Sequence, residues 1–217
     1  MDGEKIRVVL VDDHVMFAES LARRLTDEGD MDVVGIANSG GQLMEMLGSV
    51  DANVVLMDYQ LPDGDGVTLA AAVREASPES HVVILTGADD ESLMVDAIQV
   101  GCAGFITKDR ASAEVVRAVR AVAQGEALIS PPMLARLLPR LRQDVGESNL
   151  SLTDRELELL GCFSRGLTNR AIAEELHLSV NTVRNYSQVM LAKMGAHSKL
   201  EAVSIAMRQR LISLPAS

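Results

Sequence analysis

From residue 5 to about residue 124, short apolar runs alternate with amphipathic segments. Five runs are predicted to be strands: IRVVLV, MDVVGIA, NVVLM, HVVIL and GFIT. Runs as apolar as RVVLV and HVVIL suit strands that are covered on both faces. Between and after them, apolar residues recur at helical spacing in the segments 14–28, 40–49, 67–76, 91–99 and 112–123. This alternation predicts an α/β domain over residues 1–125, with a doubly wound, five-stranded parallel sheet.

The pattern changes after residue 125. Residues 126–148 contain three prolines and a polar Gly/Ser stretch, and the apolar positions from Met133 to Leu141 fit one short helix, so we expect a linker with an embedded helix. From 149 to 217 the spacing predicts helices alone, at 154–164, 168–176, 180–194 and 199–210. Thr153 and Glu156 can form a capping box at the first of them. We therefore predict a small all-α, four-helix domain.

Charge separates the same two regions. A chain of 217 residues suits two domains, and its net charge of −11 argues at first against nucleic acid as a ligand. Residues 1–125, however, hold 22 acidic and 9 basic residues, whereas residues 149–217 hold 6 acidic and 8 basic ones. The helical region can therefore bind DNA if its cations gather on one face, with dimerisation strengthening a modest affinity.

Two further features concern the cellular compartment. No apolar run approaches the ~20 residues that a membrane span needs, and the first residues do not form a targeting segment. Cys102 and Cys162 lie in apolar segments without metal-type spacing, which favours buried reduced thiols over a redox pair. We expect a cytoplasmic protein that has no membrane contact.

Polar residues stand where four of the predicted strands end: Asp12 and Asp13, Asp58, Thr86, and Lys108. Because open α/β sheets bind ligands at the carboxyl ends of their strands, we expect these side chains to converge. Three carboxylates in one crevice repel each other unless a cation lies among them, and hard oxygen ligands suit Mg²⁺. The sequence therefore predicts a magnesium site.

The same residues suit phosphoryl transfer. Asp58, on a central strand, is placed to attack a phosphoryl donor, while Lys108 can pair with the new phosphoryl group and Thr86 can donate a hydrogen bond to it. Each residue alone has a simpler explanation, as a helix cap, a turn residue or a solvated lysine. Their occurrence together, in strand order, favours a phosphoryl-accepting pocket.

A helix-turn-helix is predicted within SRGLTNRAIAEELHLSVNTVRNYSQVMLAKM. Its second helix places Asn181, Arg184, Asn185 and Gln188 on one polar face. Arginine can recognise guanine, and asparagine or glutamine can recognise adenine, in the major groove. Taken alone, these side chains would more simply be the solvated face of a surface helix.

Residues 5–124 resemble the receiver domain of two-component response regulators, through VDDH, MDYQLPDGDG, LTG and GFITKD. The resemblance implies a flavodoxin-like fold, phosphorylation of Asp58 by a histidine kinase, and Mg²⁺ held by Asp12, Asp13, Asp58 and the Gln60 carbonyl. It also implies that Thr86 and Lys108 sense the phosphoryl group. Phe105 matches the switch aromatic of that family, although core packing explains it equally well.

Residues from 149 onward resemble the LuxR-type DNA-binding domain, through LTDRELELL, GLTNRAIAEELHLSVNTVRNY and LAKMGAHSKLEAV. The whole architecture is similar to that of NarL/FixJ response regulators. The resemblance implies base contacts from Arg184, Asn185 and Gln188, and phosphate contacts from Asn181, Thr182, Lys193 and Lys199. In such proteins the last helix pairs two domains, so Val203, Ile205 and Ala206 are either a dimer surface or core.

We therefore expect a transcription regulator, not a metabolic enzyme. Phosphorylation of Asp58 would shift a pre-existing equilibrium toward a homodimer with free recognition helices. The expected partners are a cognate sensor histidine kinase and double-stranded promoter DNA, with RNA polymerase as a further candidate. Two alternatives are a regulator that works without phosphorylation and a Mg²⁺-dependent phosphatase or phosphotransferase with Asp58 as its nucleophile.

Overall fold

The computed structural model describes residues 5–87, 90–108, 112–141 and 152–212. Within these residues the chain forms two compact units. The first contains residues up to Asp90 together with Gly104–Ala123, and the second contains Glu91–Ala103 together with residues from Gln124 onward. The boundary expected between linker and C-terminal domain, at 148/149, lies outside the described residues.

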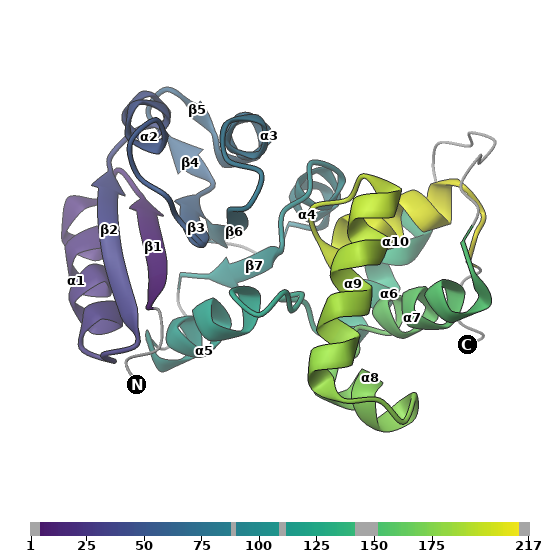
Figure 1. The fold of residues 1–217 in the computed structure, drawn as a ribbon. Helices are drawn as coiled ribbons and strands as arrows, with labels where there is room; N and C mark the ends of the chain where they lie inside the picture. Colours follow the sequence, from purple (N-terminus) through teal and green to yellow (C-terminus); the bar gives the residue numbers. More distant parts are fainter. Residues whose placement is uncertain (1–4, 88–89, 109–111, 142–151, 213–217) are drawn as a thin grey trace. The chain divides into compact units, whose positions relative to one another are not determined.

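The first unit is built on a parallel sheet with strand order β2-β1-β3-β6-β7 (Figure 1). Its strands are β1 (Ile6–Val11), β2 (Met31–Ala37), β3 (Val54–Asp58), β6 (His81–Thr86) and β7 (Gly104–Thr107). The central strand β3 is buried along its whole length. Because the chain leaves β1 toward β2 on one side and later adds β3 on the other, the ends of β1 and β3 form a topological switch point, where such sheets bind ligands.

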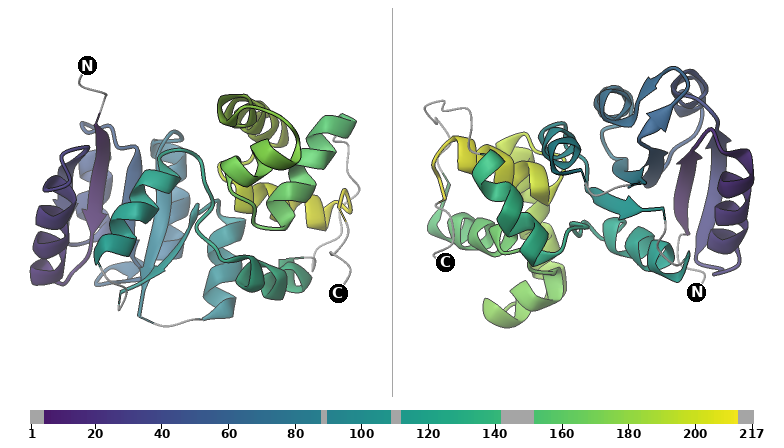
Figure 2. Two further views of the ribbon diagram at one scale, coloured as in Figure 1. Left: turned by 90° about the horizontal axis from the view of Figure 1, so that it is seen from below. Right: turned by 180° about the vertical axis from the view of Figure 1, so that it is seen from behind.

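Four helices cover this sheet: α1 (Val15–Thr26), α2 (Gly40–Leu47), α3 (Gly66–Ala76) and α5 (Ser112–Val122). Figure 2 shows α1 and α5 on one face and α2 and α3 on the other. The predicted parallel sheet is confirmed with four of its five expected helices, while the helix expected at 91–99 belongs to the second unit. One element was not predicted, a two-residue antiparallel hairpin of β4 (Gln60–Leu61) and β5 (Gly64–Asp65) between β3 and α3.

The second unit is helical in all its described elements. It contains α4 (Glu91–Gln99), α6 (Pro131–Leu141), α7 (Asp154–Ser164), α8 (Asn169–Glu175), α9 (Val180–Met194) and α10 (Lys199–Arg208). The four predicted C-terminal helices are confirmed, and so is the capping box of Thr153 and Glu156.

Helix α6 is more than a short helix embedded in a linker. Its four leucines, at positions 134, 137, 138 and 141, are all 0% exposed, and the helix packs against α4, α7 and α10. Glu91 at the start of α4 forms ion pairs with Arg136 and Arg140 of α6. Leucines spaced three, four and seven residues apart form one apolar face, and that face belongs to the core of the second unit.

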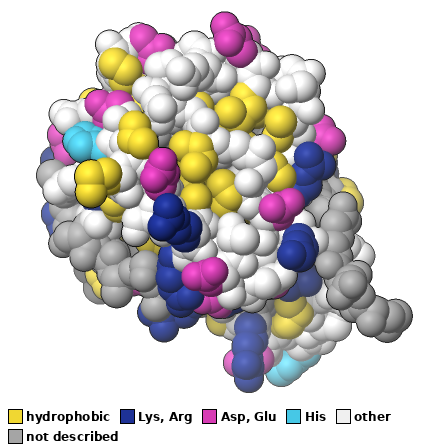
Figure 3. Space-filling view, turned by 90° about the vertical axis from the view of Figure 1, so that its left-hand side faces the viewer, with side chains coloured by type: hydrophobic (Ala, Val, Ile, Leu, Met, Phe, Trp, Pro, Cys, Tyr) yellow, Lys and Arg dark blue, Asp and Glu magenta, His cyan; other side chains and the backbone are white. Residues whose placement is uncertain are grey.

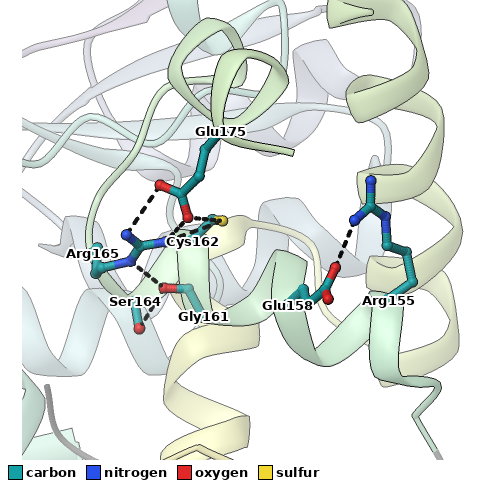
Figure 4. A network of polar contacts seen from close by, with 7 residues as sticks. All are labelled: Arg155, Glu158, Gly161, Cys162, Ser164, Arg165 and Glu175. Carbon is teal, nitrogen blue, oxygen red and sulfur yellow. Dashed lines mark hydrogen bonds and ion pairs between the residues drawn. The ribbon is translucent and has the colours of Figure 1, made fainter. Parts of the chain in front are cut away.

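Polar contacts connect α7 to α8 around a buried thiol (Figure 4). Arg165 forms an ion pair with Glu175 and donates a hydrogen bond to the Gly161 carbonyl, and it also lies 3.4 Å from the Cys162 sulfur. Burial raises the pKa of Cys162, and burial raises the pKa of Cys102 to about 12. Both cysteines are free and buried, as the sequence predicted.

The edge strand β2 lies on a face where hydrophobic side chains gather, as Figure 3 shows. Ile36 on this strand is 37% exposed.

No helix in the described part of the chain is long and apolar enough to cross a membrane.

Candidate functional site

Three of the residues predicted at strand ends, Asp12, Asp13 and Asp58, meet at the switch point of the first unit. Asp12 follows β1 and Asp58 ends β3, and both carboxylates are almost completely buried. Asp13 and His14 lie beside them, and one ligand atom from each of these four residues lies within 4.8 Å of the others. The His14 ring nitrogen Nδ1 lies 2.7 Å from an oxygen of Asp13. The carboxyl ends of the strands therefore bring together three carboxylates that could hold a metal ion.

Lys108 is the cation of this pocket. Its Nζ lies 2.7 Å from Asp12 Oδ2 and 2.7 Å from Asp58 Oδ2, and 5.1 Å from the centre of the Phe17 ring. Burial lowers the pKa of Lys108, but the hydrogen bonds to the two carboxylates outweigh burial, so its pKa is raised. The ammonium is therefore held in its charged form against the carboxylate that we expect to react.

Thr86 and Lys108 are brought together by the sheet. Thr86 ends β6 and is buried, and its carbonyl accepts a hydrogen bond of 2.8 Å from the Lys108 backbone N–H. Phe105 is half-buried on the edge strand β7, opposite Ile84 of β6, which is compatible with both of its expected roles. Gln60 begins β4, two residues after Asp58.

Sequence reasoning missed Gly66, the first residue of α3. A Cβ atom at this position would meet the backbone carbonyl oxygen of Asp58 far inside van der Waals contact. The Gly66 N–H donates to the Tyr59 carbonyl at 2.7 Å, which keeps the start of α3 against the end of β3. Only glycine allows this approach. The GDG run marks a turn in the sequence, but its partner could be seen only in three dimensions.

Asp63 was also missed. Its carboxylate accepts hydrogen bonds of 2.9 Å from the backbone N–H groups of both Gly40 and Gly41, at the start of α2. The hydrogen bond from Gly40, and to a lesser degree that from Gly41, lowers the pKa of Asp63. The contact fixes the β4–β5 hairpin, and with it the segment that follows Asp58, to a neighbouring helix.

We expect the Asp63→Asn variant to unfold at a lower temperature than the wild type at pH 6, because an amide offers one acceptor oxygen instead of two charged ones. A carboxyl whose pKa is lower in the folded state stabilises the fold when the pH is above its pKa in the unfolded state. That stabilisation is lost as the pH falls through its pKa in the folded state. The difference in melting temperature should therefore shrink below about pH 4. Melting curves that differ equally at pH 6 and pH 3 would contradict this role for the Asp63 charge.

Helix α9 presents most of the polar side chains predicted to contact DNA. Its buried side contains Val183, Ser187, Met190 and Met194, and the opposite side exposes Asn181, Asn185, Gln188 and Lys193. Thr182 and Arg184 are half-buried. Ser179 caps the helix by accepting a hydrogen bond from the Thr182 N–H, and Lys193 forms an ion pair with Glu156 of α7.

Lys199 does not lie on this surface, which corrects its expected role as a phosphate contact. It is 3% exposed, donates to Asn169 Oδ1 at 2.7 Å and lies 3.0 Å from Glu126 Oε2. Its Nζ also lies 5.0 Å from the centre of the Phe163 ring. A side chain enclosed in this way has no surface to offer to a phosphate.

The segment Gln124–Glu126, between α5 and α6, contacts three elements of the helical unit. Glu126 accepts a hydrogen bond from the Asn169 N–H at the start of α8 and pairs with Lys199 of α10. The Gln124 side chain accepts a 2.6 Å hydrogen bond from Arg184 of α9. Arg184, one of the side chains predicted to contact bases, is therefore hydrogen-bonded to another residue of the same chain.

The face of α10 that was predicted to be a dimer surface or core is core in the described unit. Val203 and Ala206 are 0% exposed and Ile205 is half-buried. The helix packs against α4, α6, α7 and α9.

Comparisons with known proteins find two matching families along the chain. Residues 8–120 match the model of the response regulator receiver domain, and residues 150–206 match that of the bacterial regulatory proteins of the luxR family. The probable transcriptional regulatory protein NarL of Mycobacterium tuberculosis is 36% identical over 96% of this chain and 97% of its own length. The DNA-binding transcriptional activator DevR/DosR of the same species is 35% identical over 93% of this chain and 94% of its own.

A solved structure also matches along almost the whole chain. The response regulator ChrA of a heme-sensing two-component system is 31% identical, with a TM-score of 0.50, over 97% of this chain and 100% of that one.

Proposed function

Because the chain belongs to the NarL family of two-component response regulators, which regulate transcription, we propose that phosphorylation of Asp58 by a sensor histidine kinase controls its dimerisation and its binding to promoter DNA. The observation that carries the proposal is the position of Asp58. Its carboxylate is buried at the end of the central strand, in contact with Lys108 and within a cluster of acidic side chains. Promoter DNA as the target implies a cytoplasmic location.

In the proposed transfer, a carboxylate oxygen of Asp58 forms a bond to the phosphorus while the bond from phosphorus to the kinase histidine breaks. The leaving imidazole nitrogen keeps the electron pair of the broken bond. Lys108, which already contacts the carboxylate, then pairs with a phosphoryl oxygen. The buried Thr86 hydroxyl donates to another oxygen, so the end of β6 responds to the modification.

The ligand atoms of this pocket fit Mg²⁺. Carboxylate oxygens of Asp12, Asp13 and Asp58 are the hard donors that this cation prefers, and one ammonium does not balance three carboxylates, two of which are buried. The Gln60 carbonyl is the proposed fourth protein contact. When bound, Mg²⁺ would neutralise charge on the phosphoryl oxygens.

The helical unit supports the output of this switch. Asn181, Asn185, Gln188 and Lys193 are exposed on one side of α9, as base and phosphate contacts require. Arg184 is bound to Gln124 in the segment that follows α5, and the α10 face that would join two copies is enclosed by α4 and α6. We propose that phosphorylation frees Arg184 and α10 together, which would couple dimerisation to DNA binding.

Treatment with acetyl phosphate and Mg²⁺ tests the first step. We expect the wild type to gain the mass of one phosphoryl group, to form more dimer in sedimentation velocity and to bind DNA more tightly. Asp58→Ala should show none of these changes. Asp51→Asn, a variant at a carboxylate whose side chain is 99% exposed, should behave as the wild type.

Either of two results would refute the proposal. An adduct that persists in Asp58→Ala would place the phosphoryl group elsewhere. No adduct in the wild type, combined with strong DNA binding, would favour a regulator that works without phosphorylation.

A further inference from the structure

Helix α9 (labelled in Figure 1) carries exposed apolar side chains at positions 186, 189 and 192, which are spaced three residues apart. Val189 is 64% exposed and Tyr186 is 46% exposed, so this helix carries two of the five exposed large hydrophobic residues in the described part of the chain. Ala192 is exposed as well. The opposite side of the helix is already packed through Val183 and Met190. Val189 therefore contributes little to the folded domain.

The position of Val189 on the helix is informative. Successive residues of an α-helix are rotated by about 100°, so Val189, four residues after Asn185, lies roughly 40° from it around the axis. On its other side lie Thr182 and Lys193, two of the expected phosphate contacts. Val189 thus stands between side chains expected to reach bases and side chains expected to reach the backbone. DNA bound to α9 would cover it.

We propose that Val189 recognises the 5-methyl group of a pyrimidine, thymine above all, in the major groove. A branched apolar side chain pressed against DNA gains from contact with an apolar group, and the thymine methyl is the apolar group that this groove displays. Phosphates offer it only charge and bound water. The inference rests on the proposed DNA binding by α9, and it adds a contact that discriminates thymine from cytosine next to Asn185.

The test begins with the full-length protein, phosphorylated with acetyl phosphate and Mg²⁺, which selects binding duplexes from a random pool. In a selected duplex, each thymine is replaced in turn by deoxyuridine, which lacks only the methyl group. We expect one replacement in each half-site to weaken wild-type binding about fourfold, the effect of one buried methyl. Val189→Ala should bind the thymine duplex several-fold less tightly, and should not respond to deoxyuridine at that position.

Met16→Ala is a matched control, because Met16 is the most exposed large hydrophobic residue among those described and lies on α1. It should bind both duplexes as the wild type does. At the responding position, cytosine and 5-methylcytosine are then compared. If the wild type binds 5-methylcytosine more tightly than cytosine, Val189 recognises the methyl group on both pyrimidines. If it binds the two equally, recognition is limited to thymine.

Three outcomes overturn the inference. If no deoxyuridine replacement changes wild-type affinity, there is no contact with a thymine methyl group. If Val189→Ala loses as much affinity as the wild type on the same replacement, another residue makes the contact. A Val189→Ala variant that dimerises less but keeps the methyl response makes Val189 a protein contact instead. Failure to enrich any duplex would refute the proposed DNA binding as well, so the two failures are distinguishable.

Discussion

Replacing Gly66 with alanine is expected to displace Asp58 and to slow its phosphorylation. The added Cβ would collide with the Asp58 backbone carbonyl and with the Cα of Tyr59, and backbone cannot rotate away as a flexible side chain can. Overpacking at such a site typically destabilises a domain by about 1–3 kcal/mol, and a backbone neighbour places this one at the upper end. A carboxylate shifted by about 1 Å also loses reactivity, so we expect the rate of adduct formation with acetyl phosphate to fall about tenfold or more.

The matched control is Gly64→Ala in the same loop, where a Cβ would have nothing within 4 Å. This exposed substitution should change stability by no more than about 0.5 kcal/mol. Intact mass measured over time gives the phosphorylation rate, and amide hydrogen exchange of residues 54–58 reports the stability around β3. If the two variants phosphorylate and exchange alike, the contact between Gly66 and Asp58 does not position the phosphoacceptor.

Replacing Glu126 with alanine is expected to destabilise the helical unit by about 3–5 kcal/mol at pH 7, because it leaves the buried Lys199 ammonium without its counter-charge. Burial already lowers the pKa of Lys199, and the nearby Arg184 adds to that effect, while Glu126 opposes both. The variant should therefore have a still lower Lys199 pKa.

The sign of the pH dependence follows from this direction. A lysine whose pKa is lower in the folded state destabilises the fold, and this effect has its full size at any pH below the folded-state pKa. The destabilisation disappears as the pH rises to the unfolded-state pKa, near 10.4. The stability lost in Glu126→Ala should thus shrink between pH 7 and pH 10. Hydrogen exchange of the α10 residues at both pH values measures it.

Two comparisons identify the cause. Adding Lys199→Met to Glu126→Ala removes the unpaired charge and should restore much of the lost stability. Glu174→Ala removes one partner of an exposed ion pair with Arg170 in the same unit and should change stability by less than about 1 kcal/mol. If Glu126→Ala is no more harmful than Glu174→Ala, the buried pair with Lys199 does not stabilise the domain.

Much of this protein could be predicted from local patterns in the sequence. Apolar runs and helical spacing located the sheet and the helices because burial imposes a period of two or 3.6 residues on neighbouring positions. The pocket was predictable for a related reason. Parallel strands all end at one edge of a sheet, so Asp12, Asp58 and Lys108 had to meet once the strands were recognised.

Only the tertiary structure decided how distant segments pair. Glu126 contacts Lys199 across 73 residues and Asn169 across 43, and no periodicity in the sequence relates such positions. The same holds for Asp63 at the start of α2 and for the carbonyl that Gly66 approaches. Lys199 shows the consequence. The resemblance to the LuxR-type domain implied a DNA phosphate as its partner. A charge, however, is exposed or enclosed according to which elements pack over it, and packing is a property of the whole fold.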